Sequence, residues 1–239
     1  MITVIIPAHN EEDNLKRLLP TLNRSAFTGP VEIIVALSCE NNDDCEQITV
    51  DRTIRFIKSS KKGRAVQMNT AAASAKGNIL VFLHADVHPP NSFLQDIERT
   101  IEEGNDAGFF SYRFDKKSLL LKINASFTSK DGIFTGGGDQ CLFIKKQVFF
   151  DLGKFDEKQV LMEDFEFFNR MKKNEVRYKI IKNDLIVSAR KYNNNSYLRV
   201  NLSNLLLVFL FRLGYPPEKL KSLHNRLLRV PYGHNSQSG

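Results

Sequence analysis

Residues 1–13 read Met-Ile-Thr-Val-Ile-Ile-Pro-Ala-His-Asn-Glu-Glu-Asp, and this opening stretch indicates the fold class. Its first part, Ile2 to Ile6, is a continuous apolar run, which is typical of a strand buried inside a parallel sheet, and Pro7 is expected to end it. Asn10 can cap a following helix whose first turn is acidic. That helix would have one apolar face, formed by Leu15, Leu18, Leu19 and Leu22.

The alternation of strand and helix continues along the first half of the chain. Strands are expected at 32–36, 54–57 and 79–83, with an alanine-rich helix at 64–75 that could lie close on a sheet. This pattern predicts an α/β domain with helices on both faces of the sheet.

Beyond Asp86 the pattern is less regular, and a mixed central sheet is therefore expected. The elements predicted there are a helix to Glu103, a strand at 108–114, a glycine run at 136–138, a helix at 163–173 and short strands at 178–181 and 186–188.

The chain shows no linker that would divide its 239 residues into two equal parts. We expect a main domain at 1–195, a C-terminal basic helical segment at 196–233 with helices at 196–213 and 217–228, and a disordered tail at 234–239. The net charge is +7, and residues 197–239 hold six Lys/Arg against one acid. Such a segment suits nucleic acid, an anionic membrane surface or an acidic ligand, and the alternative is a solvated face.

Other features of the sequence bear on where the protein works. Three cysteines without metal-site spacing favour a reducing compartment, and the N-terminus lacks the pattern of a signal peptide. The longest apolar run, 205–211, is too short to span a bilayer. We therefore expect a cytoplasmic protein, with the inner face of the membrane as a further location, and no nucleic-acid partner, because the basic segment has no recognition motif.

Candidate site residues follow the predicted strands, where parallel sheets bind ligands. Pro7, His9 and Glu11 follow the first strand, and Arg64 follows the third. The segment His84-Ala-Asp86-Val-His88 follows the fourth strand. Residues two apart on an extended chain share a face, so these side chains could hold Mn²⁺ or Mg²⁺; the alternative is a capping Asp between two surface histidines.

Acidic residues further along the chain are also candidates. Glu163 and Asp164 open a predicted helix, where they could be catalytic or could complement the helix dipole. Asp139 follows three glycines that would allow a ligand to approach the backbone closely. Neither GxGxxG nor GxxxxGK[ST] occurs, which argues against nicotinamide enzymes and P-loop ATPases.

Taken in order, four segments resemble the family 2 glycosyltransferases, which have the GT-A fold. They are Val4-Ile-Ile-Pro-Ala-His-Asn-Glu-Glu12, Lys62-Gly-Arg-Ala-Val-Gln-Met-Asn69, Gly77-Asn-Ile-Leu-Val-Phe-Leu-His-Ala-Asp86, and Gly138-Asp-Gln-Cys-Leu-Phe143 followed by Leu161-Met-Glu-Asp164. Details such as Ser188-Ala-Arg190 are similar to a bacterial subgroup, the radical-SAM/selenodomain-associated "transferase 2" proteins.

The resemblance implies a nucleotide-diphosphate sugar as donor and a role for each matching residue. Asp164 of the Glu163-Asp164 motif would be the general base, and Asp86 would bind the divalent metal with His88 and His84. The residues implied to bind substrate are Pro7, His9, Glu11, Glu40, Arg64, Asn69, Asp139 and Arg190.

Two positions depart from the pattern of the family. Leu37 stands where an acid usually meets the nucleotide base, so Glu40 or Asp43 would have to replace it, and His84 replaces the first acid of the DxD motif. The leading hypothesis is an inverting, metal-assisted glycosyl transfer to an unknown acceptor hydroxyl. The acceptor is either soluble or lipid-linked and presented to the C-terminal helices at a membrane. The alternatives are a non-catalytic nucleotide-sugar binder and, with less support, a nucleotidyltransferase.

Overall fold

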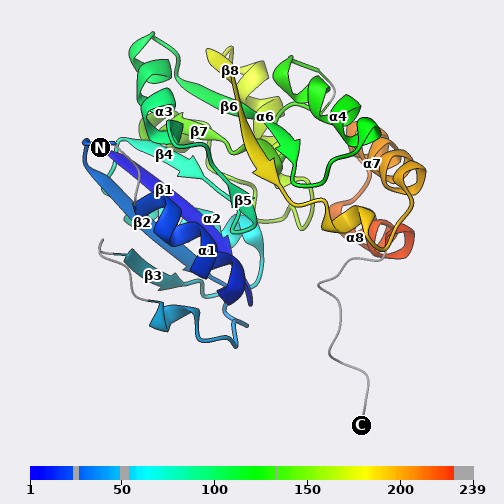
Figure 1. Cartoon of the computed structure of the whole chain (residues 1–239), viewed down its shortest axis with the longest axis horizontal. Coiled ribbons are helices and arrows are strands. Elements are labelled where there is room, and N and C mark those ends of the chain that lie inside the picture. Colours follow the sequence, from blue (N-terminus) through cyan, green and yellow to red (C-terminus); the bar gives the residue numbers. More distant parts are fainter. Residues whose placement is uncertain (24–26, 49–53, 133, 229–239) are drawn as a thin grey trace.

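A single mixed sheet organises the chain in the computed structural model, which describes residues 1–23, 27–48, 54–132 and 134–228 (Figure 1). The expected tail at 234–239 lies outside the described residues. Within them the strands are β1 (Ile2–Ala8), β2 (Val31–Leu37), β3 (Ile54–Lys58), β4 (Ile79–Phe82), β5 (Val87–His88), β6 (Ala107–Phe114), β7 (Phe143–Lys145) and β8 (Tyr178–Val187).

The spatial order of the strands is β3-β2-β1-β4-β7-β6-β8-β5. The first four strands are parallel, with Val4 of β1 beside Ile33 of β2 on one side and Val81 of β4 on the other. β7 is antiparallel to both β4 and β6, β8 is parallel to β6, and β5 is antiparallel to β8. The expectation of a mixed α/β sheet is therefore confirmed.

Helices cover both faces of this sheet, as expected. Leucines of α1 (Glu12–Asn23) and apolar residues of α3 (Phe93–Glu102) pack in one buried cluster. On the other face, α2 (Arg64–Ser74), α5 (Lys146–Asp151) and α6 (Glu163–Lys173) pack in a second cluster, where the buried alanines of α2 let it lie close to the strands. The remaining helices are α4 (Leu119–Ser126), α7 (Tyr197–Arg212) and α8 (Pro217–Leu227), with 3₁₀ turns η1 (Cys45–Gln47), η2 (Phe127–Ser129), η3 (Gly138–Gln140) and η4 (Arg190–Tyr192).

The expectation that Pro7 ends the first strand was wrong. β1 continues to Ala8, and Pro7 lies beside Ala36 of β2. The ladder between β1 and β4 stops at Ile5 and Phe82, and the backbone N of Pro7 faces that side. Among the described strands, none pairs with Pro7 on that side, so no hydrogen bond is lost through the N–H that proline lacks.

Other local expectations were also corrected by tertiary contacts. The first helix begins not on a cap from Asn10, whose φ is 54°, but on the Asp43 carboxylate, which accepts a hydrogen bond of 2.8 Å from the Glu12 amide. The two short strands expected at 178–181 and 186–188 are one strand, β8. A register irregularity between Phe110 and Tyr112 of β6 lets that long pairing continue.

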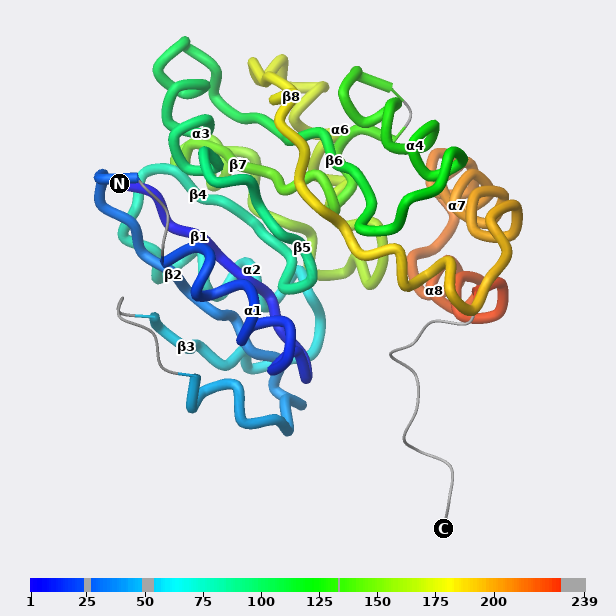
Figure 2. Tube along the Cα trace, viewed as in Figure 1, coloured from blue at the N-terminus to red at the C-terminus, as the bar shows by residue number. Residues whose placement is uncertain are grey.

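The C-terminal helices pack against one end of the sheet domain, beside α4 and the start of α6 (Figure 2). A third buried cluster joins Leu207 and Val208 of α7, Leu220 of α8 and Met162, the residue before α6. The boundary at 195/196 remains a prediction. Among the described helices, none has the length and apolar character that crossing a membrane would require.

Candidate active site

Two adjoining cavities lie where β1 and β4 end. The β1 cavity, of about 400 Å³, is lined by Pro7, His9, Glu11, Asp86 and Arg190 among others. The α7 cavity, of about 260 Å³, extends from Asp164 toward α7. Both are lined by Arg64, His84, Tyr112, Phe114, Asp139, Lys191, Tyr192 and Asn204, so they form one continuous cleft.

Arg64, the first residue of α2, is the centre of a charged cluster where the two cavities meet. Its guanidinium donates a short hydrogen bond to Glu163 and lies 3.6 Å from Asp164 Oδ2. It also lies 3.3 Å from His84 Nε2, and His84 Nδ1 lies 3.7 Å from Asp139 Oδ1. Segments 75 to 100 residues apart in sequence thus place two carboxylates against Arg64 and a third, Asp139, against the adjacent His84.

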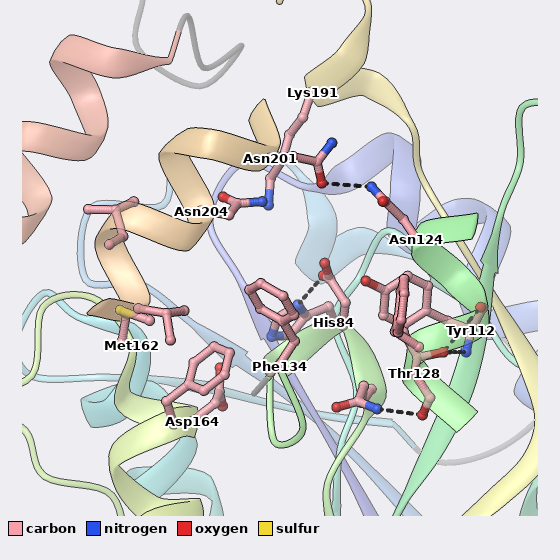
Figure 3. Close-up of a pocket in the computed structure, with 18 of the residues that line it drawn as sticks. His84, Tyr112, Asn124, Thr128, Phe134, Met162, Asp164, Lys191, Asn201 and Asn204 are labelled. Atoms are coloured by element: carbon pink, nitrogen blue, oxygen red, sulfur yellow. Dashed lines mark hydrogen bonds and ion pairs between the residues drawn. The ribbon is translucent and has the colours of Figure 1, made fainter. Parts of the chain in front are cut away.

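The two acids that open α6 have different environments. Glu163 is 2% exposed and tied to Arg64, which lowers its pKa against the effect of burial. Burial, together with the neighbouring Glu163 charge, raises the pKa of Asp164 to about 6. Asp164 lines the α7 cavity, so it is a carboxylate with a raised proton affinity facing a cleft, which is the character of a general base (Figure 3).

Asp139 is held ionised beside this pair. Burial opposes its ionisation, but Lys191, His84 and Arg64 outweigh it and hold the pKa well below its usual range. The glycine run brings the loop close, because a Cβ on Gly138 would lie 2.5 Å from both Asp164 Oδ2 and His84 Cε1. A side chain at position 138 would therefore displace the Asp164 carboxylate and the His84 ring.

Arg190 and Asp86 form the ion pair of the β1 cavity, with Arg190 Nη2 2.8 Å from Asp86 Oδ2. Glu11 lines the same cavity, and burial raises its pKa, with the Asp86 charge adding to the effect. His9 and Lys191 add cationic or protonatable groups to the walls. The cations of this cavity, Arg64, Arg190 and Lys191, can contact an anionic ligand such as a diphosphate.

The expected metal ligands His84, Asp86 and His88 are not assembled into one set. A turn at Ala85–Asp86, closed by the Val87 N–H to His84 carbonyl hydrogen bond, breaks the extended geometry on which the expectation depended. His84 faces Asp139, Asp86 pairs with Arg190, and His88 lines a separate cavity beside Pro89. In the described part of the chain, no three His, Cys, Asp or Glu side chains are close enough together to hold a metal ion.

Three other candidate residues lie away from the cleft or are engaged elsewhere. Asn69 is buried and exchanges hydrogen bonds with the Phe155 backbone, which is a structural contact. Glu40 is half exposed and pairs with Lys62 at 2.7 Å. Asp43, the other expected substitute for the acid missing at Leu37, accepts the Glu12 amide at the start of α1.

Aromatic side chains of the cleft were not among the candidates. Tyr112 and Phe114 lie two apart on β6 and face both cavities, together with Tyr192 of η4, while Phe134 lines only the α7 cavity (Figure 3). Burial raises the pKa of Tyr112, so it stays a neutral hydroxyl. The alternation of Tyr112 and Phe114 could have indicated a shared face, but nothing local showed that this face is open to a cavity.

Comparison with known proteins gives matches over most of the chain. The family model "Glycosyl transferase family 2" matches residues 3–155. Glycosyltransferase GlyA of Streptococcus pneumoniae is 21% identical over the whole chain, which covers 38% of that protein. The chain spans less than half the length of the curated relatives it matches first.

Solved structures are similar in fold. One is S. aureus TarS 1–349 in complex with UDP-GlcNAc, with a TM-score of 0.66 and 16% identity over 95% of this chain and 71% of that one. Another is the mannosyltransferase PcManGT of Pyrobaculum calidifontis in complex with GDP-Man and Mn²⁺, with a TM-score of 0.64 and 17% identity over 95% of this chain and 68% of that one.

Proposed function

The chain belongs to glycosyl transferase family 2, and from that membership we propose that it transfers a sugar from a nucleoside-diphosphate sugar to an acceptor hydroxyl. Its GT-A-like mixed sheet agrees with the fold expected from the sequence. The finer resemblance to the radical-SAM-associated subgroup remains a prediction. The observation that carries the proposal is Asp164, a largely buried carboxylate with a raised pKa that lines the α7 cavity 3.6 Å from Arg64.

In the proposed reaction, Asp164 accepts the proton of the acceptor hydroxyl. The hydroxyl oxygen bonds to the anomeric carbon as the bond from that carbon to the diphosphate oxygen breaks, and the diphosphate leaves with the electron pair. Glu163 is tied to Arg64, so Asp164 is the acid of this pair left to act as base. One displacement by one base predicts inversion at the anomeric carbon.

The departing diphosphate would lie in the β1 cavity, where cationic side chains can balance its charge. Arg190 and Lys191 line this cavity from the segment after β8, and Arg64 lines it from the start of α2. Fixed cations at the position where charge develops stabilise a transition state because they need no reorganisation. Pro7, His9 and Glu11 would then contact the nucleotide, as the family resemblance implies.

Divalent-metal assistance of the transfer is tested by the titrations with and without Mn²⁺ described below. The residues around Asp86 do not fit the expected three-ligand set, because Asp86 is engaged by Arg190 and the two histidines face elsewhere. The steps proposed above are therefore assigned to side chains of this chain alone.

The donor site can be tested by calorimetric titration with UDP, GDP, CDP and dTDP, each with and without Mn²⁺. We expect one diphosphate to bind, and Arg190→Ala to weaken its binding about tenfold or more through loss of a charge-assisted contact. Arg177→Ala is the matched control, since Arg177 is exposed near the opposite end of β6 and β8. Equal losses in both variants, or no binding of any diphosphate, would contradict the donor site.

The pH dependence of turnover should report the base. Asp164 must be ionised to accept a proton, and its raised pKa places the loss of activity near pH 6. We expect kcat/KM to fall about tenfold per pH unit below that value, with nucleotide affinity changing much less. A rate that stays constant down to pH 5 would exclude Asp164 as the base.

Gly138→Ala should impair turnover more than stability. The added Cβ would lie within 2.5 Å of Asp164 Oδ2 and His84 Cε1, so the acid must move. A displacement of about 1 Å can cost about 10²-fold in rate, and we expect kcat to fall by that order while the unfolding midpoint shifts little. Gly132→Ala, where the new methyl group meets nothing within 4 Å, is the control.

The acceptor would enter through the α7 cavity. Its wall combines the amides of Asn124, Asn201 and Asn204 with Phe134 and Leu207 (Figure 3). These side chains suit an acceptor that has both a polar and an apolar part. A lipid-linked acceptor therefore remains part of the proposal. Nucleotide binding without transfer to any acceptor would instead favour the non-catalytic alternative.

A further inference from the structure

Helix α7 presents a stripe of large apolar side chains to solvent. Leu198, Leu202 and Phe209 are 68%, 63% and 58% exposed, and they lie on one face because they are four and seven residues apart. The whole stripe consists of Leu198, Leu202, Leu205, Leu206, Phe209 and Leu213. Its opposite face carries the packed residues Val200, Leu207 and Val208, so the exposed stripe is not the side that holds α7 to the domain.

Helix α4 and the turn after it add exposed apolar side chains beside α7. Leu119, Leu120, Ile123 and Phe127 are between 46% and 75% exposed. The two helices are tied together, since Asn124 of α4 donates to Asn201 of α7 at 2.8 Å and Tyr197 donates to Asn124 at 2.6 Å. α4 and α7 also lie next to each other in Figures 1 and 2. We call this combined surface the α4–α7 face.

Within the two segments that form the α4–α7 face, most charged side chains are positive. Residues 116–130 contain four lysines and no acid. Residues 196–228 contain five Lys/Arg and one acid, Glu218. Among these, Lys116, Lys117, Lys122 and Arg212 are exposed. An apolar stripe bordered by cations complements a surface in which an anionic layer covers an apolar one.

We propose that the α4–α7 face docks on an anionic lipid bilayer, with the leucines and Phe209 in the headgroup–acyl boundary and the lysines and arginines against the lipid phosphates. A second copy of this chain is a poorer occupant, because a symmetric contact would bring the two basic borders together. The lipid contact needs no transfer reaction, so it stands or fails apart from the proposed function.

The docked orientation also favours one class of acceptor for the proposed reaction. This inference rests on the proposed function. α7 lines the α7 cavity with Asn204, Leu207 and Val208 while its other side carries the exposed stripe. One helix thus separates the bilayer from the cavity that contains Asp164. The acceptor class favoured by this arrangement is a hydroxyl or sugar carried by a lipid.

Vesicle flotation of the full chain tests the docking. We expect binding to vesicles of equimolar phosphatidylcholine and phosphatidylglycerol, weaker binding to phosphatidylcholine alone, and loss of affinity with added salt. The double variant Leu202→Glu/Phe209→Glu should bind the anionic vesicles about tenfold more weakly or worse, since it replaces inserted apolar groups with charges that the phosphates repel.

A charge-matched control separates this face from net charge. Thr21→Glu/Gln147→Glu adds the same two negative charges at exposed positions of α1 and α5, and it should bind the vesicles like the unchanged chain. Equal binding by both double variants, or no binding of the unchanged chain to anionic vesicles, would overturn the proposal. So would a dimer in gel filtration that Leu202→Glu/Phe209→Glu dissociates, because the occupant would then be a second copy.

Discussion

Asp164→Asn is expected to lower kcat by about 10²–10⁴-fold while nucleotide binding stays within about threefold of the unchanged chain. The amide has nearly the shape of the carboxylate but cannot accept the acceptor's proton. The side chain of Asp164 lines the α7 cavity and not the β1 cavity, which would bind the nucleotide. Turnover with a matched donor and acceptor, together with calorimetry of the nucleoside diphosphate, measures the two effects separately.

Asp106→Asn is the control for this substitution. Asp106 pairs with Lys145 and Arg177 before the start of β6, and it lines neither cavity of the cleft. It should keep turnover close to that of the unchanged chain. Unchanged turnover in Asp164→Asn would remove Asp164 from the reaction, whereas loss of nucleotide binding in that variant would show that it acts through the structure of the whole site.

Arg64→Met should produce the largest loss of stability among the site variants. It leaves Glu163, which is 2% exposed, as a buried carboxylate without its cationic partner. Removing one member of a buried pair costs about 3–5 kcal/mol, and we expect the free energy of unfolding in urea to fall by an amount near the lower end of that range, because Arg64 is 40% exposed. Nucleotide binding should fall as well, since Arg64 lines the β1 cavity.

Two further variants separate stability from function at this position. Arg64→Met/Glu163→Gln removes the unpaired charge and should recover most of the stability without recovering turnover. Arg55→Met breaks the pair between Arg55 and the buried Glu32 of β2, which lies beside Thr3 of β1 and away from the cleft. This variant should lose stability while it keeps nucleotide binding. If the double variant is no more stable than Arg64→Met, the unpaired Glu163 is not the cause of the loss.

The fold class could be predicted because periodicity in this chain is local and strong. The run at Ile2–Ile6, the leucines of α1 and the alanines of α2 each specify an element through the faces they must bury, and these elements were found within a few residues of their predicted ends. The short elements β5, β7, α4 and α5 were not predicted. A strand of two or three residues has no periodicity to detect, and helices of six and eight residues span only about two turns.

The candidate site was predicted in part for the same reason. Pro7, His9 and Glu11 come together with Arg64 and Arg190 because parallel strands end at one edge of a sheet, which the order of elements already implies. The aromatic wall of Tyr112 and Tyr192 was missed, since two segments 80 residues apart form it.

Local patterns along the chain were enough to predict the order of most strands and helices, the edge of the sheet at which the cleft opens, and the acids that line this cleft. The charge pairs become visible only in the folded chain: Asp86 with Arg190, Glu163 with Arg64, and Asp43 with the start of α1. It also separated His88 from His84, and it placed α4 beside α7. A local pattern sets which face a side chain occupies within its own element, whereas its partner depends on turns and packing between segments far apart in the chain.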